Sequence, residues 1–179
     1  GDGGRSRLLL RLDMYGLEEY EVRGDGNCQF RALSDQLFRN EGNHEQVRGM
    51  VVEQLLRKPS KYSPYVPENY AGYCARMAAE GEWGDHVCLQ AAADALGTRI
   101  CLVTSFPEGV CVEIEPEEVK SERVLWLSFF AEVHYNSIYP KGEGLKGRLL
   151  SHPLKGLRMI ANQAVAHITG ADSMPASPF

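Results

Sequence analysis

The sequence predicts an α+β domain in which a mostly antiparallel or mixed β-sheet is packed between helices. Apolar residues recur at helical spacing through residues 28–97, whereas residues 98–140 hold short runs rich in β-branched and aromatic residues. Helices followed by strands are typical of this class. The 179 residues, 44% hydrophobic and 24% charged, are enough for one soluble domain with a full core.

The first half of the domain is expected to hold one short strand and four helices. The strand is placed at 17–23, and the glycine-rich turn Gly24–Asn27 follows it. Asn43 and Asp85 can cap two of the helices, and Gly97 can end the last one. The expected helices are 28–38, 43–58, 67–80 and 86–97.

The second half is expected to form the rest of the sheet. Four segments are of strand length and are separated by turn-forming residues. Because short turns join them, most neighbours should pair antiparallel. The expected strands are 98–106, 109–115, 123–130 and 131–140.

Composition places the domain boundaries. We expect residues 1–11 to be an N-terminal extension, of which the opening GDGGR can equally be an added sequence, and residues 12–141 to be the folded domain. Residues 142–179 are expected to form a basic glycine-rich linker, an amphipathic helix through 154–168 and a disordered end. The helix is either a solvated extension packed on the domain or a docking element for a partner.

The net charge and the cysteine pattern argue against several classes of protein. The formal net charge of −5 argues against nucleic acid and anionic membranes as partners, and no apolar run reaches membrane-spanning length. The start of the sequence does not resemble a signal peptide. Five cysteines without a C-x-x-C pair do not form a secreted disulfide framework, so we expect a cytoplasmic or nuclear protein.

Cys28 is the first candidate functional residue. It lies at a helix start, where unpaired N–H groups and the helix dipole stabilise a thiolate. The glycines before it allow a sharp turn of the kind that an oxyanion hole needs. A small buried hydrophobe is the alternative interpretation, and the turn alone does not decide between the two.

A thiolate nucleophile needs a proton shuttle and an orienting partner, and the segment Val133–Ser137 offers both. In a strand, His134 and Asn136 share a face. Asparagine is a poor strand former, and its amide oxygen could fix the tautomer of the imidazole. The residues alone give only this candidate pair.

Three segments resemble the ovarian tumour (OTU) family of cysteine proteases, most closely its small plant-type members. They are GDGNCQFRALSDQL, WGDHVCLQAAADALGTRICLV and FFAEVHYNSIYP, in the order of the family, and the resemblance covers residues 12–140. It implies a papain-like scaffold and deubiquitinase activity, with hydrolysis of the isopeptide bond after the ubiquitin C-terminal glycine. It implies no cofactor and no metal.

The resemblance also implies roles for four residues. Cys28 would be the nucleophile, His134 the general base and later acid, and Asn136 the residue that orients the histidine. Asp25 matches an aspartate of the family's nucleophile motif and would shape the oxyanion loop, in which the N–H of Cys28 would donate. Asn136, being neutral, should stabilise an imidazolium less than the aspartate that some relatives carry.

The ubiquitin tail ends in Leu-Arg-Leu-Arg-Gly-Gly. A channel that binds it should offer carboxylates to the two arginines and a narrow passage lined by small residues for the two glycines. Glu82, Asp85 and Glu132 are candidate acidic contacts, and Trp83 is a candidate wall of the cleft. A solvated surface position is the alternative for each carboxylate.

Metal sites fit the sequence poorly. The calcium-loop pattern that begins at Asp25 fails because Phe30 occupies the glycine position, and the cysteine spacings match no zinc site. Two other functions stay open. One is a ubiquitin-binding module without activity, and the other is a hydrolase acting on a ubiquitin-like modifier.

Overall fold

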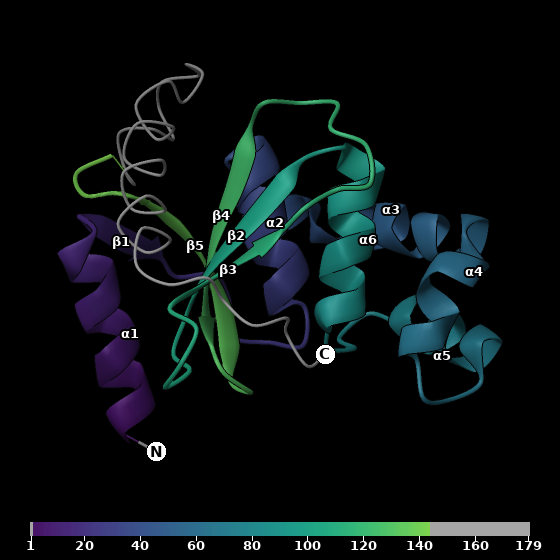
Figure 1. Ribbon diagram of the computed structural model, residues 1–179, viewed down its shortest axis with the longest axis horizontal. Coiled ribbons are helices and arrows are strands. Elements are labelled where there is room, and N and C mark those ends of the chain that lie inside the picture. Colours follow the sequence, from purple (N-terminus) through teal and green to yellow (C-terminus); the bar gives the residue numbers. More distant parts are fainter. Residues whose placement is uncertain (1, 144–179) are drawn as a thin grey trace.

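The computed structural model of the protein describes residues 2–143 and builds them around a five-stranded sheet (Figure 1). Three neighbouring strand pairs are antiparallel, and the β2–β4 pair is parallel. The predicted α+β class with a mixed sheet is therefore confirmed. In spatial order the strands are β1 (Leu17–Tyr20), β5 (His134–Pro140), β4 (Val124–Phe130), β2 (Arg99–Thr104) and β3 (Cys111–Ile114).

Helices cover both faces of the sheet (Figure 1). Helix α1 (Asp2–Met14) packs on one face, α2 (Cys28–Phe38) and α6 (His86–Leu96) pack on the other, and α3 (His44–Arg57) lies against α2 and α6. No helix within the described range is long and apolar enough to cross a membrane. The smaller helical elements are η1 (Glu41–Asn43), α4 (Pro59–Tyr62), η2 (Ser63–Tyr65) and α5 (Tyr70–Met77).

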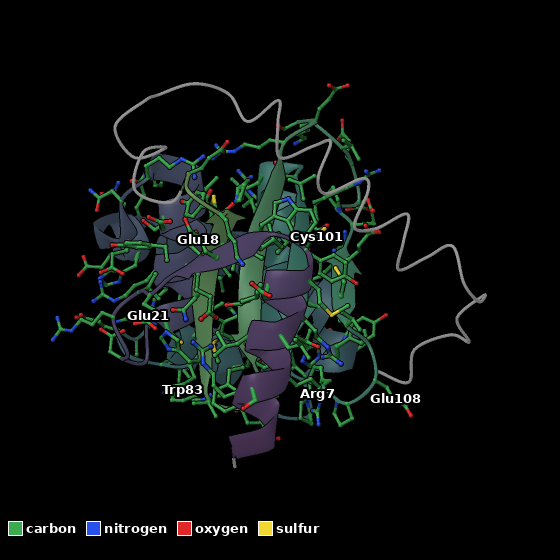
Figure 2. All side chains as sticks on the ribbon, turned by 90° about the vertical axis from the view of Figure 1, so that its left-hand side faces the viewer. Arg7, Glu18, Glu21, Trp83, Cys101 and Glu108 are labelled. Carbon is green, nitrogen blue, oxygen red and sulfur yellow. The ribbon has the colours of Figure 1, made fainter. Side chains whose placement is uncertain are left out.

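Helix α1 corrects the expectation that residues 1–11 form an extension. Leu8 and Leu12 are 0% and 2% exposed in a core cluster with residues of the sheet, and Figure 2 shows the helix lying over this face of the sheet. The apolar residues that face the sheet are four apart, but the exposed Leu9 and Leu10 obscure this period in the sequence. The helix is part of the packed domain.

Two of the three helix-terminating residues predicted from the sequence have that role in the structure. The Asp85 side chain accepts the N–H of Cys88 at 2.9 Å, and Gly97 ends α6 in the left-handed region with φ of 61°. Asn43 makes no side-chain cap, because the short helix η1 precedes α3 and Asn40 caps that element instead. Two elements are shorter than predicted: strand β1 ends at Tyr20 instead of residue 23, and helix α5 spans Tyr70–Met77 instead of 67–80.

The end of the described chain returns to the turn between helix α1 and strand β1. The N–H of Lys141 donates to the carbonyl of Gly16 at 2.9 Å, directly after strand β5. The amphipathic helix expected through 154–168 and the disordered end lie outside the described residues, so both stay predictions.

Candidate active site

Cys28 is the first residue of helix α2 and follows the turn Gly24–Asn27. Its side chain is buried, with 4% of the residue exposed. A Cβ built on Gly26 would lie 1.7 Å from the carbonyl oxygen of Gly81, so the turn accepts only glycine there. The turn thus packs backbone to backbone on the loop that precedes helix α6.

Asp25 holds this turn in shape. Its carboxylate accepts the N–H of Asn27 at 2.9 Å and two hydrogen bonds from the Arg31 guanidinium, at 2.9 Å from Nη2 and 3.1 Å from Nε. The Arg31 hydrogen bonds lower the pKa of Asp25 to about 2, against the opposing effect of burial. The structure therefore places Asp25 as an ionised brace of the turn, near Cys28 in sequence but engaged with Arg31.

A buried arginine on helix α3 ties the same turn to the loop before α6. Arg48 donates through Nη2 to Asn27 Oδ1 and to the carbonyl of Glu82, both at 2.8 Å, and through Nη1 to the carbonyl of Met77 at 2.9 Å. Asn27 Oδ1 also accepts the N–H of Gly81 at 2.9 Å. Asn27 and Arg48 were missed by the sequence reasoning, because nothing local marks a helical arginine as buried.

Strand β5 brings His134 and Asn136 together on one face. His134 Nε2 lies 2.7 Å from Asn136 Oδ1, and the same oxygen accepts the N–H of Val22 at 3.0 Å. The contact with a backbone N–H identifies this atom as the amide oxygen, which can only accept. His134 Nε2 therefore carries the hydrogen in the neutral ring and leaves Nδ1 as the free lone pair.

The imidazole of His134 also reaches Cys28. The interaction with the Cys28 side chain is the main cause that raises the pKa of His134, with burial acting in the opposite direction. Because Nε2 is occupied by Asn136, Nδ1 is the nitrogen left to serve Cys28. The structure thus brings together Cys28, His134 and Asn136, which the sequence placed on a helix start and a distant strand.

The oxyanion loop differs from the sequence expectation. The N–H of Cys28 was expected to be available for a developing oxyanion, but it donates to the carbonyl of Asp25 at 3.2 Å. Gly26 is the glycine that this turn requires, because a Cβ there would meet the Gly81 carbonyl. The Asp25 carbonyl must therefore turn away before the Cys28 N–H can serve another acceptor.

Asp85 does not present a free carboxylate. Besides capping helix α6, it accepts the hydroxyl of Tyr73 at 2.9 and 3.0 Å, and its carbonyl accepts Gln29 Nε2 at 3.0 Å. These contacts join α5, α2 and α6 behind Cys28. The sequence predicts Asp85 both as a helix cap and as an acidic contact of the ubiquitin tail, whereas in the structure its carboxylate is engaged within the fold.

The other three substrate candidates lie at the surface. Trp83 is 55% exposed and is visible at the periphery of the molecule in Figure 2. Glu82 forms an ion pair with Arg76. Glu132 is exposed in the turn between β4 and β5, two residues before His134, with φ of 61°. Among residues 2–143, no group of three metal-ligating side chains could hold an ion.

The chain is similar to a known family and to several of its members. The family described as OTU-like cysteine protease matches residues 23–138. OVARIAN TUMOR DOMAIN-containing deubiquitinating enzyme 12 of Arabidopsis thaliana is 56% identical over 133 residues, covering 74% of this chain and 61% of that protein. Deubiquitinating enzyme 9 of the same series and organism is 55% identical over 137 residues, covering 76% of this chain and 40% of that protein. This chain thus spans less than two thirds of either relative.

Solved structures share the fold. The OTU domain of OTUD1 superposes with a TM-score of 0.65 at 19% identity, covering 76% of this chain and 97% of that domain. An ovarian tumor (OTU) domain in complex with ubiquitin gives a TM-score of 0.56 at 19% identity, covering 84% of this chain and 88% of that chain. At such identities the likeness concerns the fold.

Proposed function

This chain belongs to the family of OTU-like cysteine proteases, and on that premise we propose that it is a deubiquitinase that hydrolyses the isopeptide bond after the ubiquitin C-terminal glycine. The observation that carries the proposal is the series of contacts from Cys28 through His134 to Asn136. A thiol, an imidazole that takes its proton and an amide that orients the imidazole are the groups that cysteine-based covalent catalysis requires. The names of the relatives above support ubiquitin as the modifier.

In the first half of the proposed reaction, His134 Nδ1 takes the proton of the Cys28 thiol and the sulfur attacks the carbonyl carbon of the terminal glycine. The C–N bond then breaks, and the imidazolium gives its proton to the leaving lysine amine. Ubiquitin is left joined to Cys28 as a thioester. Asn136 keeps Nε2–H bound to its own oxygen throughout, so Nδ1 stays directed at the sulfur.

In the second half, His134 Nδ1 takes a proton from water, and the oxygen of that water attacks the thioester carbonyl. The C–S bond breaks, ubiquitin leaves with a free carboxylate, and the sulfur regains a proton. Both steps pass through an oxyanion, for which the Cys28 N–H is the proposed donor once the Asp25 carbonyl has turned away. All groups come from the chain or from water, so the proposal includes no metal and no cofactor.

The proposed channel for the ubiquitin tail runs past the exposed Trp83 and Glu132 and the half-buried Glu82. Glu82 and Glu132 are the proposed contacts for the tail arginines, and Trp83 is the proposed wall beside the two glycines. Asp85 is assigned a supporting role, because its carboxylate already caps helix α6 and binds Tyr73.

A ubiquitin probe with a C-terminal electrophile tests the proposal. One probe molecule should attach to each protein molecule, at Cys28, and Cys28→Ala should abolish both labelling and cleavage of ubiquitin dimers. His134→Ala should come close to this loss. Cys111→Ala, which removes a half-buried thiol on strand β3, is the matched control and should label normally. Labelling that survives Cys28→Ala contradicts the assignment.

Parallel probes separate the alternatives. Probes made from ubiquitin-like modifiers that react faster than the ubiquitin probe would assign the chain to another modifier. Ubiquitin affinity without turnover of any linkage would assign it to the binding modules. We also place the protein in the cytoplasm or nucleus, because all five cysteines are free thiols, as a reducing compartment requires.

A further inference from the structure

A buried polar cluster lies between helix α1 and the sheet and reaches the active site. Its centre is Glu19 of strand β1, whose side chain is 6% exposed. Arg5 of α1 binds its carboxylate at two points, 3.0 Å from Nη1 to Oε1 and 2.5 Å from Nη2 to Oε2. The hydroxyl of Ser128 on β4 donates to Oε1 at 2.5 Å. Asn136 completes the cluster: it is paired with Ser128 across strands β4 and β5, and as a side-chain hydrogen-bonding partner it helps to lower the pKa of Glu19.

The direction of the bond between Asn136 and Glu19 follows from the other contacts. Asn136 Oδ1 already accepts from His134 and from Val22. Burial acts to raise the pKa of Glu19, but the hydrogen bonds from Arg5, Ser128 and Asn136 lower it overall, so Glu19 is a carboxylate at neutral pH. A carboxylate only accepts, and Asn136 Nδ2 is therefore the donor.

We propose that Glu19 is a positioning residue of the active site, which acts through Asn136 on His134 and is itself held by Arg5. The inference rests on the proposed function. An amide group can present either its oxygen or its nitrogen to a neighbour, and only the oxygen can accept Nε2–H. Glu19 accepts from the nitrogen and so keeps the oxygen directed at His134.

Glu19 also supplies the negative charge that Asn136 lacks. Three groups raise the pKa of His134. The Cys28 side chain has the largest effect, and Asn136 and the Glu19 carboxylate contribute less. An imidazolium that forms during the reaction is therefore stabilised through a neutral residue by the carboxylate behind it. Arg5 faces Glu19 from α1, Cys28 faces His134 from α2, and the exposed Glu21 lies 4.0 Å from Arg5; these are the other ionisable groups in this series of contacts.

Arg5 and Glu19, the two residues that support Asn136 from helix α1 and strand β1, precede the segment that matches the family. The match begins at residue 23, whereas Arg5 and Glu19 belong to α1 and β1. Helix α1 would then do more than bury apolar surface. A purely structural ion pair between α1 and the sheet is the competing explanation, and the test must separate the two.

The test compares Glu19→Gln with Glu21→Gln. The first substitution removes the charge at position 19 and keeps the size of the side chain. Glu21 is the matched control, because it is an acidic residue with a side chain 80% exposed and 4.0 Å from the same arginine. Two readouts are used, the kcat and KM for a fluorogenic ubiquitin amide and the titration of His134 followed by NMR in a Cys28→Ala background.

We expect Glu19→Gln to lower kcat by about 10- to 100-fold with little change in KM, because the reacting groups are misplaced while the ubiquitin surface is untouched. The pKa of His134 should fall by about half a unit or more, since a nearby negative charge is lost. Glu21→Gln should change neither quantity. A merely structural ion pair would reduce thermal stability without moving the pKa of His134.

A second variant keeps the proposal testable if Glu19→Gln does not fold. Glu19→Asp retains the charge but shortens its reach toward Asn136, so kcat should still fall while the pKa of His134 changes less. Arg5→Met should lower kcat in the same direction, and combining it with Glu19→Gln should add little further loss.

Two outcomes overturn the proposal. One is a folded Glu19→Gln protein with a kcat and a His134 pKa equal to those of the parent, and the other is full turnover by Glu19→Asp. Failure of the proposed function looks different. In that case the parent chain does not cleave ubiquitin amides, although the His134 pKa, measured without ubiquitin, still responds to Glu19→Gln.

Discussion

Arg48 donates to Asn27 Oδ1 at 2.8 Å, so a side chain of helix α3 directly holds the turn that presents Cys28. The guanidinium is buried, with 4% of the residue exposed, and stacks over the ring of Phe30 at 4.1 Å. The contacts of Arg48 join α3, the turn Gly24–Asn27 and the loop before α6. The turn before Cys28 is therefore held from behind as well as by the close approach of Gly26 to Gly81.

Arg48→Lys should destabilise the protein and slow labelling of Cys28 by a ubiquitin probe. A lysine cannot reproduce the forked donors, so buried carbonyls and Asn27 Oδ1 lose partners. We expect the free energy of unfolding to fall by about 2–4 kcal/mol in urea titrations. Arg57→Lys on the same helix, at a side chain 68% exposed, is the control and should change little. Equal stability of both variants would contradict this role of Arg48.

Two glycines of the turn Gly24–Asn27 should respond differently to substitution by alanine. Gly26→Ala would place a Cβ 1.7 Å from the Gly81 carbonyl oxygen, whereas a Cβ on Gly24 meets nothing within 4 Å. Gly26→Ala should therefore displace the turn and reduce kcat/KM for a ubiquitin amide by about 100-fold or more. Gly24→Ala should stay close to the parent. Similar losses in both variants would show that the close approach to Gly81 is unimportant.

Local signals predicted much of this fold, and contacts between distant residues account for what they missed. The Asp85 cap, the Gly97 stop and the start of a helix at Cys28 depend on neighbouring residues, and each is present in the structure. The parallel pairing of β2 with β4 depends on where the chain crosses, which strand composition does not encode. Membership of the OTU family, predicted from three separate motifs, is confirmed by the match over residues 23–138.

In the candidate site, too, local sequence predicted some residues, and contacts between distant residues account for the others. Alternation along a strand was enough to place His134 and Asn136 on one face. Glu19 and Arg48 carried no local signal, because each looks like an ordinary surface charge until the fold buries it beside partners from other elements. The sequence did not predict helix α1, because two exposed leucines interrupt the spacing of its buried apolar residues. For the same reason it did not indicate Arg5, the residue of α1 that binds Glu19.

Asp25 should stabilise the protein at neutral pH and lose this effect in acid. Its pKa is lowered from 3.8 to about 2 by Arg31, so the stabilisation is complete above the unfolded value and disappears as the pH falls through the folded value. The shift corresponds to about 2 kcal/mol. Asp25→Asn should therefore lower the free energy of unfolding by about this amount near pH 7, and the difference from the parent should shrink below about pH 4.

Asp13→Asn is the control for this prediction. Asp13 also pairs with a cation, Lys141, but its side chain is 68% exposed and such pairs contribute little. Urea titrations of the three proteins between about pH 7 and pH 3 measure the effect. A difference between the parent and Asp25→Asn that does not depend on pH would exclude the ion pair with Arg31 as its cause.

Asn136→Asp should reduce the proposed ubiquitin hydrolysis, although an aspartate could in principle stabilise the imidazolium of His134 better. The amide nitrogen of Asn136 donates to Glu19, and the substitution would set a second carboxylate against that of Glu19 in a buried place. We expect kcat/KM for a ubiquitin amide to fall by about tenfold, because the pair must share a proton or move apart. Asn136→Ala, which only removes the orienting group, gives the reference loss.

The double variant Glu19→Gln with Asn136→Asp decides whether repulsion is the cause. The glutamine amide introduced on strand β1 can donate to the new carboxylate, which is then free to accept from His134 Nε2 as the native amide oxygen does. The double variant should therefore turn over ubiquitin amide several times faster than Asn136→Asp alone, an interaction that a double-mutant cycle measures directly. A double variant slower than either single one would mean that Glu19 and Asn136 act independently, and that the carboxylate behind Asn136 does not control how the amide faces His134.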